Sequence, residues 1–430
     1  MNYEESIIWI SSFEKYGMKL GLDRISYICK KLGNPQNNYK IIHVGGTNGK
    51  GSVCKFLGSI LSFSGFKVGI YISPHLQRFS ERFVINNKEI SKSDISSLVE
   101  KIKPIVEDMN RNGDNPTYFE ILTAMAFQYF NDQKVEFAVI EVGLGGRFDA
   151  TNIVQPILTI ITNVSLEHQV ELGKSLEKIA YEKAGIIKKD IPVITASKKE
   201  ALNIVKNRCK ETNSNLIIID NKKWKRLNDQ EFIIKGFLKD YKIKPNIKGF
   251  FQGENIALSI FAIENLHMNG VFIPDENIIE GIKIAENPGR MEIISNDPFI
   301  LLDGAHNISG ISALKKTIKT DFTYDKIILI IGILSDKNIE EMLEIIIPLA
   351  DTIITTKSDN KRAIEPIILK EKIKKINQIK NVTSINQIQK AIDYAKDLAK
   401  KDDLILISGS LFTVGNAREY LLKNKEKLLN

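Results

Sequence analysis

The sequence has few cysteines, few histidines and no long apolar run, and each shortage excludes a class of protein. Its 430 residues include three cysteines and five histidines. The cysteines, Cys29, Cys54 and Cys209, are far apart in the sequence, which predicts isolated buried thiols in a reducing compartment and neither a disulfide framework nor a zinc site. The longest apolar stretches, such as residues 327–334, have the length of a strand and are too short to span a membrane. The first five residues are acidic where a signal peptide would be basic, so we expect a cytoplasmic protein.

A strong net charge is also absent. The 60 basic residues are opposed by 52 acidic ones, which leaves a formal charge of +8. The densest basic cluster, at residues 370–375, is expected on a surface helix and has no interleaved aromatic side chains. We therefore expect no binding to nucleic acid, and a mild positive bias that suits polyanionic small molecules such as ATP or a polycarboxylate.

The length predicts two domains, because 430 residues exceed what one ordinary core accommodates. The first, residues 1–291, is predicted to be α/β, with a doubly wound parallel sheet, since continuous apolar runs of strand length alternate with helical patterns. The predicted strands are residues 40–44, 68–73, 135–141, 157–163 and 191–195, with a hairpin over 83–90. Short β segments at 216–220 and 230–237 predict a peripheral hairpin region.

A second α/β rhythm follows the break at residues 287–290, Asn-Pro-Gly-Arg. It predicts a smaller Rossmann-like domain over residues 292–430. Its expected strands are 299–303, 326–334, 352–357 and 403–408, with helices near 309–320, 338–350, 363–376 and 386–400. Two domains joined by one linker predict a cleft in which a ligand binds.

A glycine-rich loop between the first strand and an amphipathic helix predicts phosphate binding. It reads Gly-Gly-Thr-Asn-Gly-Lys-Gly-Ser over residues 45–52. Glycines let backbone N–H groups face a polyphosphate, the helix N-terminus adds partial positive charge, and Lys50 supplies a cation for the outer phosphates. Gly51 stands between Lys50 and Ser52, whereas the common pattern has Ser or Thr directly after the Lys, so this is a variant loop. The alternative is a glycine-rich turn without a ligand.

Polar residues at the ends of later strands predict further chemistry, because ligands of open parallel sheets bind beyond the carboxyl ends of the strands. Ser73 and Glu141 close two of the predicted strands, His168 follows a third, and Lys183 is near the end of the next helix. A carboxylate beside a phosphate loop is a usual magnesium ligand. The alternatives stay open: Glu141 paired with Arg147, a structural His168, and Lys183 as a cation favoured by the helix dipole.

The second domain carries polar groups in corresponding places. The strand ending at Asp303 continues into Gly-Ala-His306-Asn, which predicts contacts to a ribose or an amino group. Arg290 on the linker is a candidate for phosphate binding. The last strand runs into Ser408-Gly-Ser410-Leu, a small-residue turn that suits an anionic group or is a plain turn.

Taken together, these motifs resemble those of the bacterial bifunctional dihydrofolate synthase/folylpolyglutamate synthase family, within the Mur ligase superfamily. The resemblance covers nearly the whole chain. It rests on Gly-Thr-Asn-Gly-Lys-Gly-Ser at 46–52, Ser-Pro-His-Leu at 73–76 with Glu-Arg at 81–82, Glu-Val-Gly-Leu-Gly-Gly-Arg-Phe-Asp-Ala-Thr-Asn at 141–152, Glu-Lys-Ala-Gly at 182–185, Pro-Gly-Arg at 288–290, Asp-Gly-Ala-His-Asn at 303–307 and Gly-Ser-Leu at 409–411.

The resemblance implies an ATP-dependent amide ligase, acting through an acyl phosphate, that adds L-glutamate to dihydropteroate, to reduced folates, or to both. The implied cofactors are ATP and Mg²⁺, with two magnesium ions. The implied catalytic residues are Lys50, Glu141, His168, Lys183 and His306. The implied ATP contacts are Gly46, Thr47, Asn48, Gly49, Lys50, Gly51, Ser52, Asn255, Arg290, Asp303 and His306. The implied metal ligands are Ser73, Glu141, His168 and a carbamylated Lys183, and the implied substrate contacts are Arg24, Phe79, Arg82, Asp149 and Ser410.

The chain departs from the family pattern at two positions. Glu167 stands before the metal-binding His where Asp is commoner, and Ile308 follows Asn307 where Pro is usual. The first change would alter metal geometry slightly and the second only a turn. By resemblance we expect a monomer whose partners are small-molecule substrates, with neither a nucleic acid nor a membrane among them.

Three other functions compete with this interpretation. A muramyl peptide ligase would carry an additional N-terminal domain, and the 44 residues before Gly45 are too few for one. A nucleotide switch or motor would turn over ATP regardless of glutamate. A binding protein without catalysis would be expected to have lost Lys50, Glu141 or His168, and all three are present.

Overall fold

The computed structural model describes residues 1–228, 230–376 and 381–429. These fall into two compact units. Unit 1 holds Met1–Leu227, Glu231–Lys244 and Gly253–Ala285, and unit 2 holds Asn228–Gln230, Pro245–Gln252 and Glu286–Asn430. The division at residues 291 and 292 stays a prediction. None of the helices in the described ranges is both long and apolar enough to cross a membrane.

Unit 1 is built on an eight-stranded sheet with the order β4-β3-β2-β5-β1-β6-β7-β8. Six strands are parallel, and β3 and β4 form an antiparallel hairpin at one edge. The bounds are β1 Lys40–Gly45, β2 Val68–Tyr71, β3 Phe83–Ile85, β4 Lys88–Glu89, β5 Phe137–Glu141, β6 Leu158–Ile161, β7 Val193–Thr195 and β8 Leu216–Ile218. The predicted parallel-sheet domain is thus confirmed.

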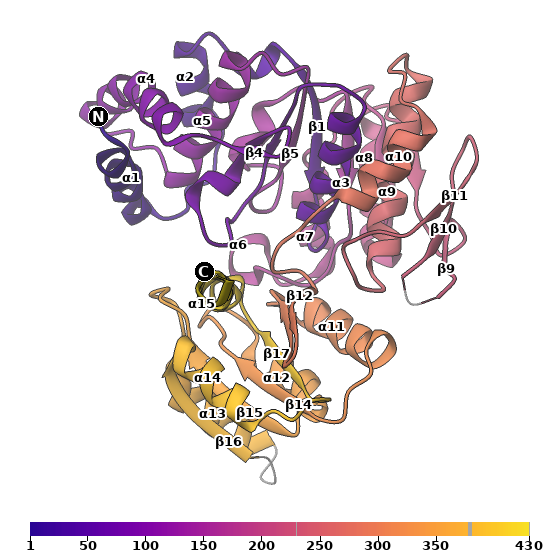
Figure 1. Ribbon diagram of the computed structural model, residues 1–430. Coiled ribbons are helices and arrows are strands. Elements are labelled where there is room, and N and C mark those ends of the chain that lie inside the picture. Colours follow the sequence, from indigo (N-terminus) through magenta and orange to yellow (C-terminus); the bar gives the residue numbers. More distant parts are fainter. Residues whose placement is uncertain (229, 377–380, 430) are drawn as a thin grey trace. The chain divides into compact units, whose positions relative to one another are not determined.

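The helices of unit 1 pack on both faces of this sheet. They are α1 Tyr3–Ser11, α2 Asp23–Lys31, α3 Lys50–Phe63, α4 Lys92–Arg111, α5 Tyr118–Asp132, α6 Gln169–Leu172, α7 Leu176–Ala184, α8 Lys199–Glu211, α9 Gln252–Met268 and α10 Asp275–Ile284, with 3₁₀ turns η1 Ser12–Tyr16, η2 Pro35–Asn37, η3 Phe79–Arg82 and η4 Ala150–Ile153. In Figure 1, α1, α2, α4 and α5 gather on one side of the unit, and α3, α9 and α10 on the other.

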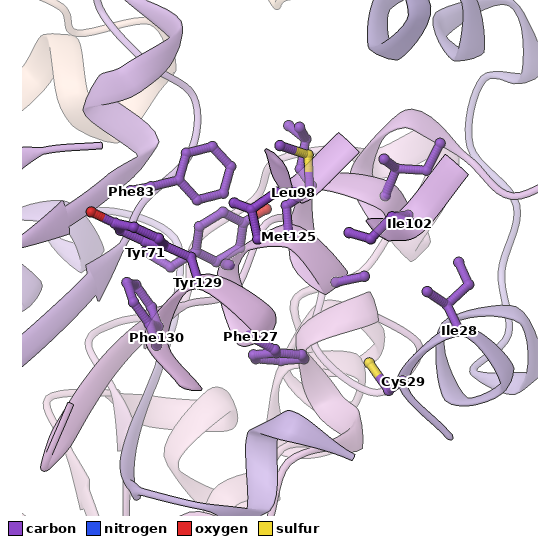
Figure 2. Packing of buried hydrophobic residues seen from close by; sticks show 14 of the residues in the cluster. Ile28, Cys29, Tyr71, Phe83, Leu98, Ile102, Met125, Phe127, Tyr129 and Phe130 are labelled. Atoms are coloured by element: carbon purple, nitrogen blue, oxygen red, sulfur yellow. The ribbon is translucent and has the colours of Figure 1, made fainter. Parts of the chain in front are cut away.

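The core under α1, α2, α4 and α5 is made of aliphatic and aromatic side chains from these helices and the sheet. Figure 2 shows part of it, with Tyr71 and Phe83 of the strands facing Phe127 and Phe130 of α5. A capping box begins α5: Thr117 Oγ1 accepts from the backbone N of Glu120, and the Glu120 carboxylate accepts from the backbone N of Thr117. The N-terminus of α5 is therefore fixed at Thr117.

Unit 2 contains a six-stranded sheet with the order β12-β13-β17-β14-β15-β16, in which only β12 is antiparallel. Its strands are β12 Glu292–Asn296, β13 Phe299–Asp303, β14 Ile327–Ile331, β15 Thr352–Lys357, β16 Asn381–Gln387 and β17 Leu404–Ser408. Its helices are α11 Ile308–Asp321, α12 Ile339–Ile346, α13 Pro366–Ile376, α14 Ile388–Leu398 and α15 Leu411–Leu429, with 3₁₀ turn η5 Ile347–Leu349. The predicted Rossmann-like domain is confirmed.

Two expectations about strands are wrong. Residues 216–220 were expected in a peripheral hairpin, but β8 pairs in parallel with β7 at the edge of the main sheet. The hairpin region is instead the antiparallel sheet of β9 Trp224–Arg226, β10 Phe232–Lys235 and β11 Asp240–Ile243. Ser73 was expected to close a strand, yet β2 ends at Tyr71, because the apolar run continues past the last residue of the ladder.

Candidate active site

The glycine-rich loop joins β1 to α3, as predicted. Gly46 and Gly49 have φ values of +128° and +86°, which residues with a Cβ rarely adopt. A Cβ on Gly46 would collide with the Thr162 hydroxyl, and one on Gly49 would collide with the side-chain amide of Asn255 on α9. The loop therefore needs glycine at both positions, and it leads directly into the N-terminus of α3 at Lys50.

The end of β6 holds the loop in place. The Asn163 side chain accepts from the backbone N of Asn48 at 3.0 Å and donates to its carbonyl at 3.1 Å. The Thr162 hydroxyl donates to the same carbonyl at 2.7 Å. Sequence reasoning did not assign Thr162 or Asn163 to the site. Their position just after the strand next to β1 was the available signal.

Lys50 folds back over the loop. Its Nζ donates to the carbonyl oxygens of Gly46 at 3.2 Å and Thr47 at 3.1 Å. The ammonium group is thus held against the backbone of the loop, where it could pair with an outer phosphate of a nucleotide.

Glu141 at the end of β5 borders the same loop. One carboxylate oxygen, Oε2, accepts from the backbone N of Ser73 at 3.1 Å and lies 3.9 Å from where a Cβ on Gly51 would be. The side chain is buried. Arg147, the alternative partner of Glu141, is exposed and donates to the Tyr181 hydroxyl at 3.0 Å. The structure thus brings Ser73, Glu141 and the loop together, as expected of residues that share a cation.

Lys183 reaches the loop from α7. Its Nζ donates to the carbonyl of Gly46 at 2.8 Å and pairs with the Glu167 carboxylate at 2.8 Å, and both side chains are almost entirely buried. Burial lowers the pKa of the Lys183 amine, while Glu167 opposes this shift. Burial alone would raise the pKa of Glu167, but Lys183 and Lys50 outweigh it and lower this pKa to about 2. Lys183 lies in the last turn of α7, where the helix dipole favours a cation, so that alternative stays open beside the contact with the loop.

His168 directly follows Glu167 and is the N-cap residue of α6. Its φ is +46°, and its Nδ1 lies 3.8 Å from a carboxylate oxygen of Glu171. Lys183 contacts both Gly46 of the loop and Glu167, and these contacts connect the loop to His168, the residue after Glu167. Among the described residues, no group of three or more His, Cys, Asp or Glu side chains forms a ready-made metal cluster.

Residues predicted to contact the substrate meet at the start of α5. Arg24 pairs with Glu120, with 3.1 Å between Nε and each carboxylate oxygen. The Arg82 guanidinium lies 5.9 Å from the ring of Tyr118 and donates to His75 Nδ1 at 2.8 Å. Burial, and then Arg82, lower the pKa of His75 to about 4, so its ring is neutral near pH 7.

We call these residues and their neighbours the α5 cluster, which consists of Arg24, Phe79, Arg82, Tyr118, Phe119 and Glu120. A row of packed aromatic rings extends this cluster. Phe79 packs on Phe83, Phe83 on Tyr71 and Tyr71 on Phe119, with ring centroids 5.6, 5.6 and 6.1 Å apart. Tyr118, Phe119 and Glu120 were missed as site residues, since the sequence showed them only as the first turn of a helix.

Asp149, the fourth predicted substrate residue in unit 1, joins the cluster through its loop. Its Oδ2 accepts from the backbone N of Leu144 at 2.8 Å, and its Oδ1 accepts from the Thr151 hydroxyl at 2.6 Å. Gly143, beside Leu144, packs so closely on Phe119 that a Cβ there would collide with the ring. Burial raises the pKa of Asp149, and its hydrogen bonds counteract the shift.

The predicted residues of unit 2 gather at the carboxyl edge of its own sheet. Asp303 is buried and accepts from the backbone N of Met291 at 3.0 Å and of Ala305 at 2.9 Å. Arg290 donates to the Gly304 carbonyl at 3.0 Å, and His306 Nδ1 lies 2.8 Å from the same oxygen. Asp303 pairs with Ser408 in the β-ladder, so the turn carrying Ser410 is adjacent. Burial raises the pKa of Asp303, opposed by Arg290.

Comparison with known proteins agrees with this arrangement. Residues 44–263 match the Mur ligase middle domain, and residues 289–411 match the Mur ligase glutamate ligase domain. A dihydrofolate synthase/folylpolyglutamate synthase of Bacillus subtilis is 35% identical over 430 residues, covering 97% of this chain and 99% of the relative.

Solved structures agree as well. The Mycobacterium tuberculosis folylpolyglutamate synthase complexed with ADP and AMPPCP is 28% identical, with a TM-score of 0.91 over 98% of this chain and 99% of that one. Escherichia coli FolC in complex with DHPP and ADP is also 28% identical, with a TM-score of 0.88 over 98% of each chain. The chain therefore belongs to the dihydrofolate synthase/folylpolyglutamate synthase family of the Mur ligases.

Proposed function

We propose that this protein uses ATP to join L-glutamate to dihydropteroate, to a reduced folate, or to both, through an acyl phosphate on the acceptor. The observation that carries the proposal is the phosphate loop of unit 1, bordered by Glu141 and tied to Lys183, in a chain that matches this ligase family along nearly its whole length. Turnover of ATP without glutamate, as in a nucleotide switch, is the competing function.

ATP is the proposed phosphoryl donor, and the relatives solved with ADP or AMPPCP support it. In unit 1, the loop amides of residues 46–52 would bind the phosphates, Lys50 would pair with the outer ones, and Asn255 would flank the loop. In unit 2, Arg290, Asp303 and His306 are proposed as further nucleotide contacts. Phosphoryl transfer needs mainly positioning and charge stabilisation, which a rigid amide loop and a lysine supply.

Magnesium is the proposed metal, with two ions. The donors fit, because Glu141 is a buried carboxylate next to the loop and the Ser73 backbone already contacts it. Ser73 and Glu141 would hold one ion, and Glu141, His168 and a modified Lys183 the second. A bound magnesium ion offsets the negative charge on transferring phosphates.

Lys183 is proposed to be carbamylated, since an ammonium group would repel a metal ion and a carbamate would bind one. Its burial supports this, because a lowered pKa leaves more neutral amine to react with CO₂. Peptide mass analysis of active, magnesium-loaded protein tests the proposal, and an unmodified Lys183 in that sample would reject it.

The acceptor acid is proposed to bind at the α5 cluster. Arg24 and Arg82 supply positive charge, and the half-buried rings of Phe79 and Phe119, backed by the fully buried Phe83 and Tyr71, offer flat apolar surface to an aromatic ring. Asp149 fixes the adjoining loop. The relative solved with DHPP and ADP supports a pterin acceptor. Ser410, at the start of α15, is proposed to contact an anionic substrate group.

The cysteines bear on where the protein is located. All three cysteines are free and buried, which supports a reducing cytoplasm. We propose small-molecule partners only, neither a nucleic acid nor a membrane, and a monomer. Gel filtration coupled to light scattering tests the last point.

The test is ATP- and Mg²⁺-dependent incorporation of labelled glutamate, run in parallel with dihydropteroate and with tetrahydrofolate. We expect incorporation with at least one acceptor, its loss in Lys50→Ala, and normal activity in Lys206→Ala, which removes an exposed lysine from α8. Incorporation with both acceptors assigns both activities. Incorporation with neither acceptor, in a protein that still hydrolyses ATP, rejects the folate assignment.

A further inference from the structure

A buried polar chain links β1 to the loop that follows β5. His43, in the middle of β1, is fully buried, and its Nε2 lies 2.9 Å from the Thr151 hydroxyl. That hydroxyl donates to Asp149 Oδ1 at 2.6 Å. His43 has no part in the nucleotide, metal or acceptor contacts proposed above.

The direction of this chain follows from the number of protons available. The Thr151 hydroxyl has one proton, which it donates in its hydrogen bond to the Asp149 carboxylate. His43 must therefore donate from Nε2, which leaves Nδ1 without a proton. Within the described residues Nδ1 has no hydrogen-bond partner, although it is buried. An apolar residue would avoid the cost of that unpaired nitrogen, so the value of His43 lies in its Nε2–H donor.

The chain ends on the backbone of the acceptor site. Asp149 binds the backbone N of Leu144 at 2.8 Å and that of Thr151 at 3.0 Å. Gly143, next to Leu144, packs against Phe119 of the α5 cluster. The orientation of the Thr151 hydroxyl thus decides how firmly the Asp149 carboxylate holds residues 143–144 against the first turn of α5.

We propose that His43 is a positioning residue for the acceptor site: its Nε2–H fixes the Thr151 hydroxyl, so that Asp149 holds residues 143–144 in place beneath the acceptor. The inference rests on the proposed function, because it assigns the acceptor to the α5 cluster. Although His43 lies two residues before the phosphate loop, we expect it to affect binding of the acceptor and not binding of ATP.

The test compares KM values for the acceptor, ATP and glutamate. His43→Leu removes the donor, Thr151→Val removes the link, and His43→Gln keeps an N–H donor. Each removal is expected to raise the acceptor KM about tenfold, the effect of losing one good hydrogen bond, and to leave the ATP KM unchanged. His43→Gln should restore the acceptor KM. Thr159→Val is the matched control, since Thr159 pairs with His43 in the β-ladder and its buried hydroxyl has no partner among the described residues.

A merely structural His43 gives a different result. It would change the ATP KM as much as the acceptor KM, because the phosphate loop begins two residues later at Gly45, and His43→Gln would not rescue it. Either observation overturns the inference. Should His43→Leu fail to fold, Thr151→Val alone decides the matter, and an unchanged acceptor KM in that variant overturns the inference too.

The tautomer provides a readout independent of activity. In protein labelled with ¹⁵N-histidine, His43 is expected to be neutral and protonated on Nε2 between pH 6 and 8. Protonation on Nδ1 would contradict the chain. Failure of the proposed function is distinguishable, since it would show as absent glutamate incorporation in the unmodified protein.

Discussion

Gly49 has a φ of +86°, and a Cβ there would collide with the side chain of Asn255. We predict that Gly49→Ala lowers kcat/KM for ATP at least about tenfold, because both the strain and the collision displace the loop. Gly65→Ala is the control, since Gly65 has a similar φ of +91° but open space around it. It should cost roughly 1 kcal/mol of stability and leave ATP kinetics unchanged. Equal ATP kinetics in the two variants would contradict the prediction.

His43 also sets a pH dependence of stability. Burial, and then Lys188, lower its pKa from 6.5 to about 3. Below pH 6.5 the unfolded chain takes up a proton that the folded protein does not, so the stability contribution is full above pH 6.5 and is lost as pH falls toward 3. Between pH 6.5 and 4.5 this amounts to about 2 kcal/mol.

Urea unfolding at several pH values checks this dependence. His43→Leu should lose less stability than the unmodified protein between pH 6.5 and 4.5, and Thr159→Val should follow the unmodified protein. An unchanged slope in His43→Leu would show that His43 takes up its proton in the folded state.

At this scale the sequence predicted the residues that carry charge at strand ends, because such residues have few other reasons to be there. Glu141, at the end of β5, borders the phosphate loop, and Lys183, predicted near a helix end, contacts the loop from the last turn of α7. Thr162 and Asn163 were missed because their roles depend on β6 lying beside β1, and Phe119 was missed because the sequence shows it only as part of the first turn of a helix. Glu167, noted only as a departure from the family pattern, is the buried ion-pair partner of Lys183.

Among the elements, α5 has the clearest dependence on one side chain. Thr117 caps its N-terminus, and the first turn carries Tyr118, Phe119 and Glu120. We predict that Thr117→Ala costs about 1 kcal/mol of unfolding free energy, measured by urea titration, and also raises the acceptor KM. Ser97→Ala, at an exposed position inside α4, should change neither. A loss of stability without any change in acceptor KM would separate α5 from the acceptor site.

Most strands of the two parallel sheets were predicted, because apolar runs are strong in buried parallel strands. The failures have physical causes. β2 ends two residues early, since its ladder pairing stops at Tyr71 although the apolar run continues through Ile72. β8 is a short edge strand among polar residues, which locally looks like a hairpin. β12 and β16 were not predicted, because both are edge strands with only partial burial.

For the whole molecule, nucleotide binding should raise stability. A ligand that binds only the folded state at 100 times its Kd adds about 2.7 kcal/mol. We predict that AMPPCP with Mg²⁺ raises the Tm of the unmodified protein and of Lys206→Ala, but shifts Lys50→Ala much less. Differential scanning calorimetry measures this. An undiminished shift in Lys50→Ala would remove that lysine from the proposed ATP site.

At this scale the two α/β units could be predicted from the chain length and the Pro-Gly break. The prediction of function depended on several motifs occurring in one order. No single motif distinguishes a ligase from a nucleotide switch, since both need a phosphate loop and a carboxylate beside it. A ligase is therefore distinguished from a nucleotide switch by whether its ATP turnover requires glutamate.

The most direct test is the ratio of phosphate released to amide bond formed, measured with an acceptor present and with or without glutamate. The account predicts one phosphate for each amide bond, and a fall of at least about tenfold in phosphate release when glutamate is omitted. Phosphate release at the same rate with and without glutamate, and without amide product, would contradict it and identify a nucleotide-driven switch.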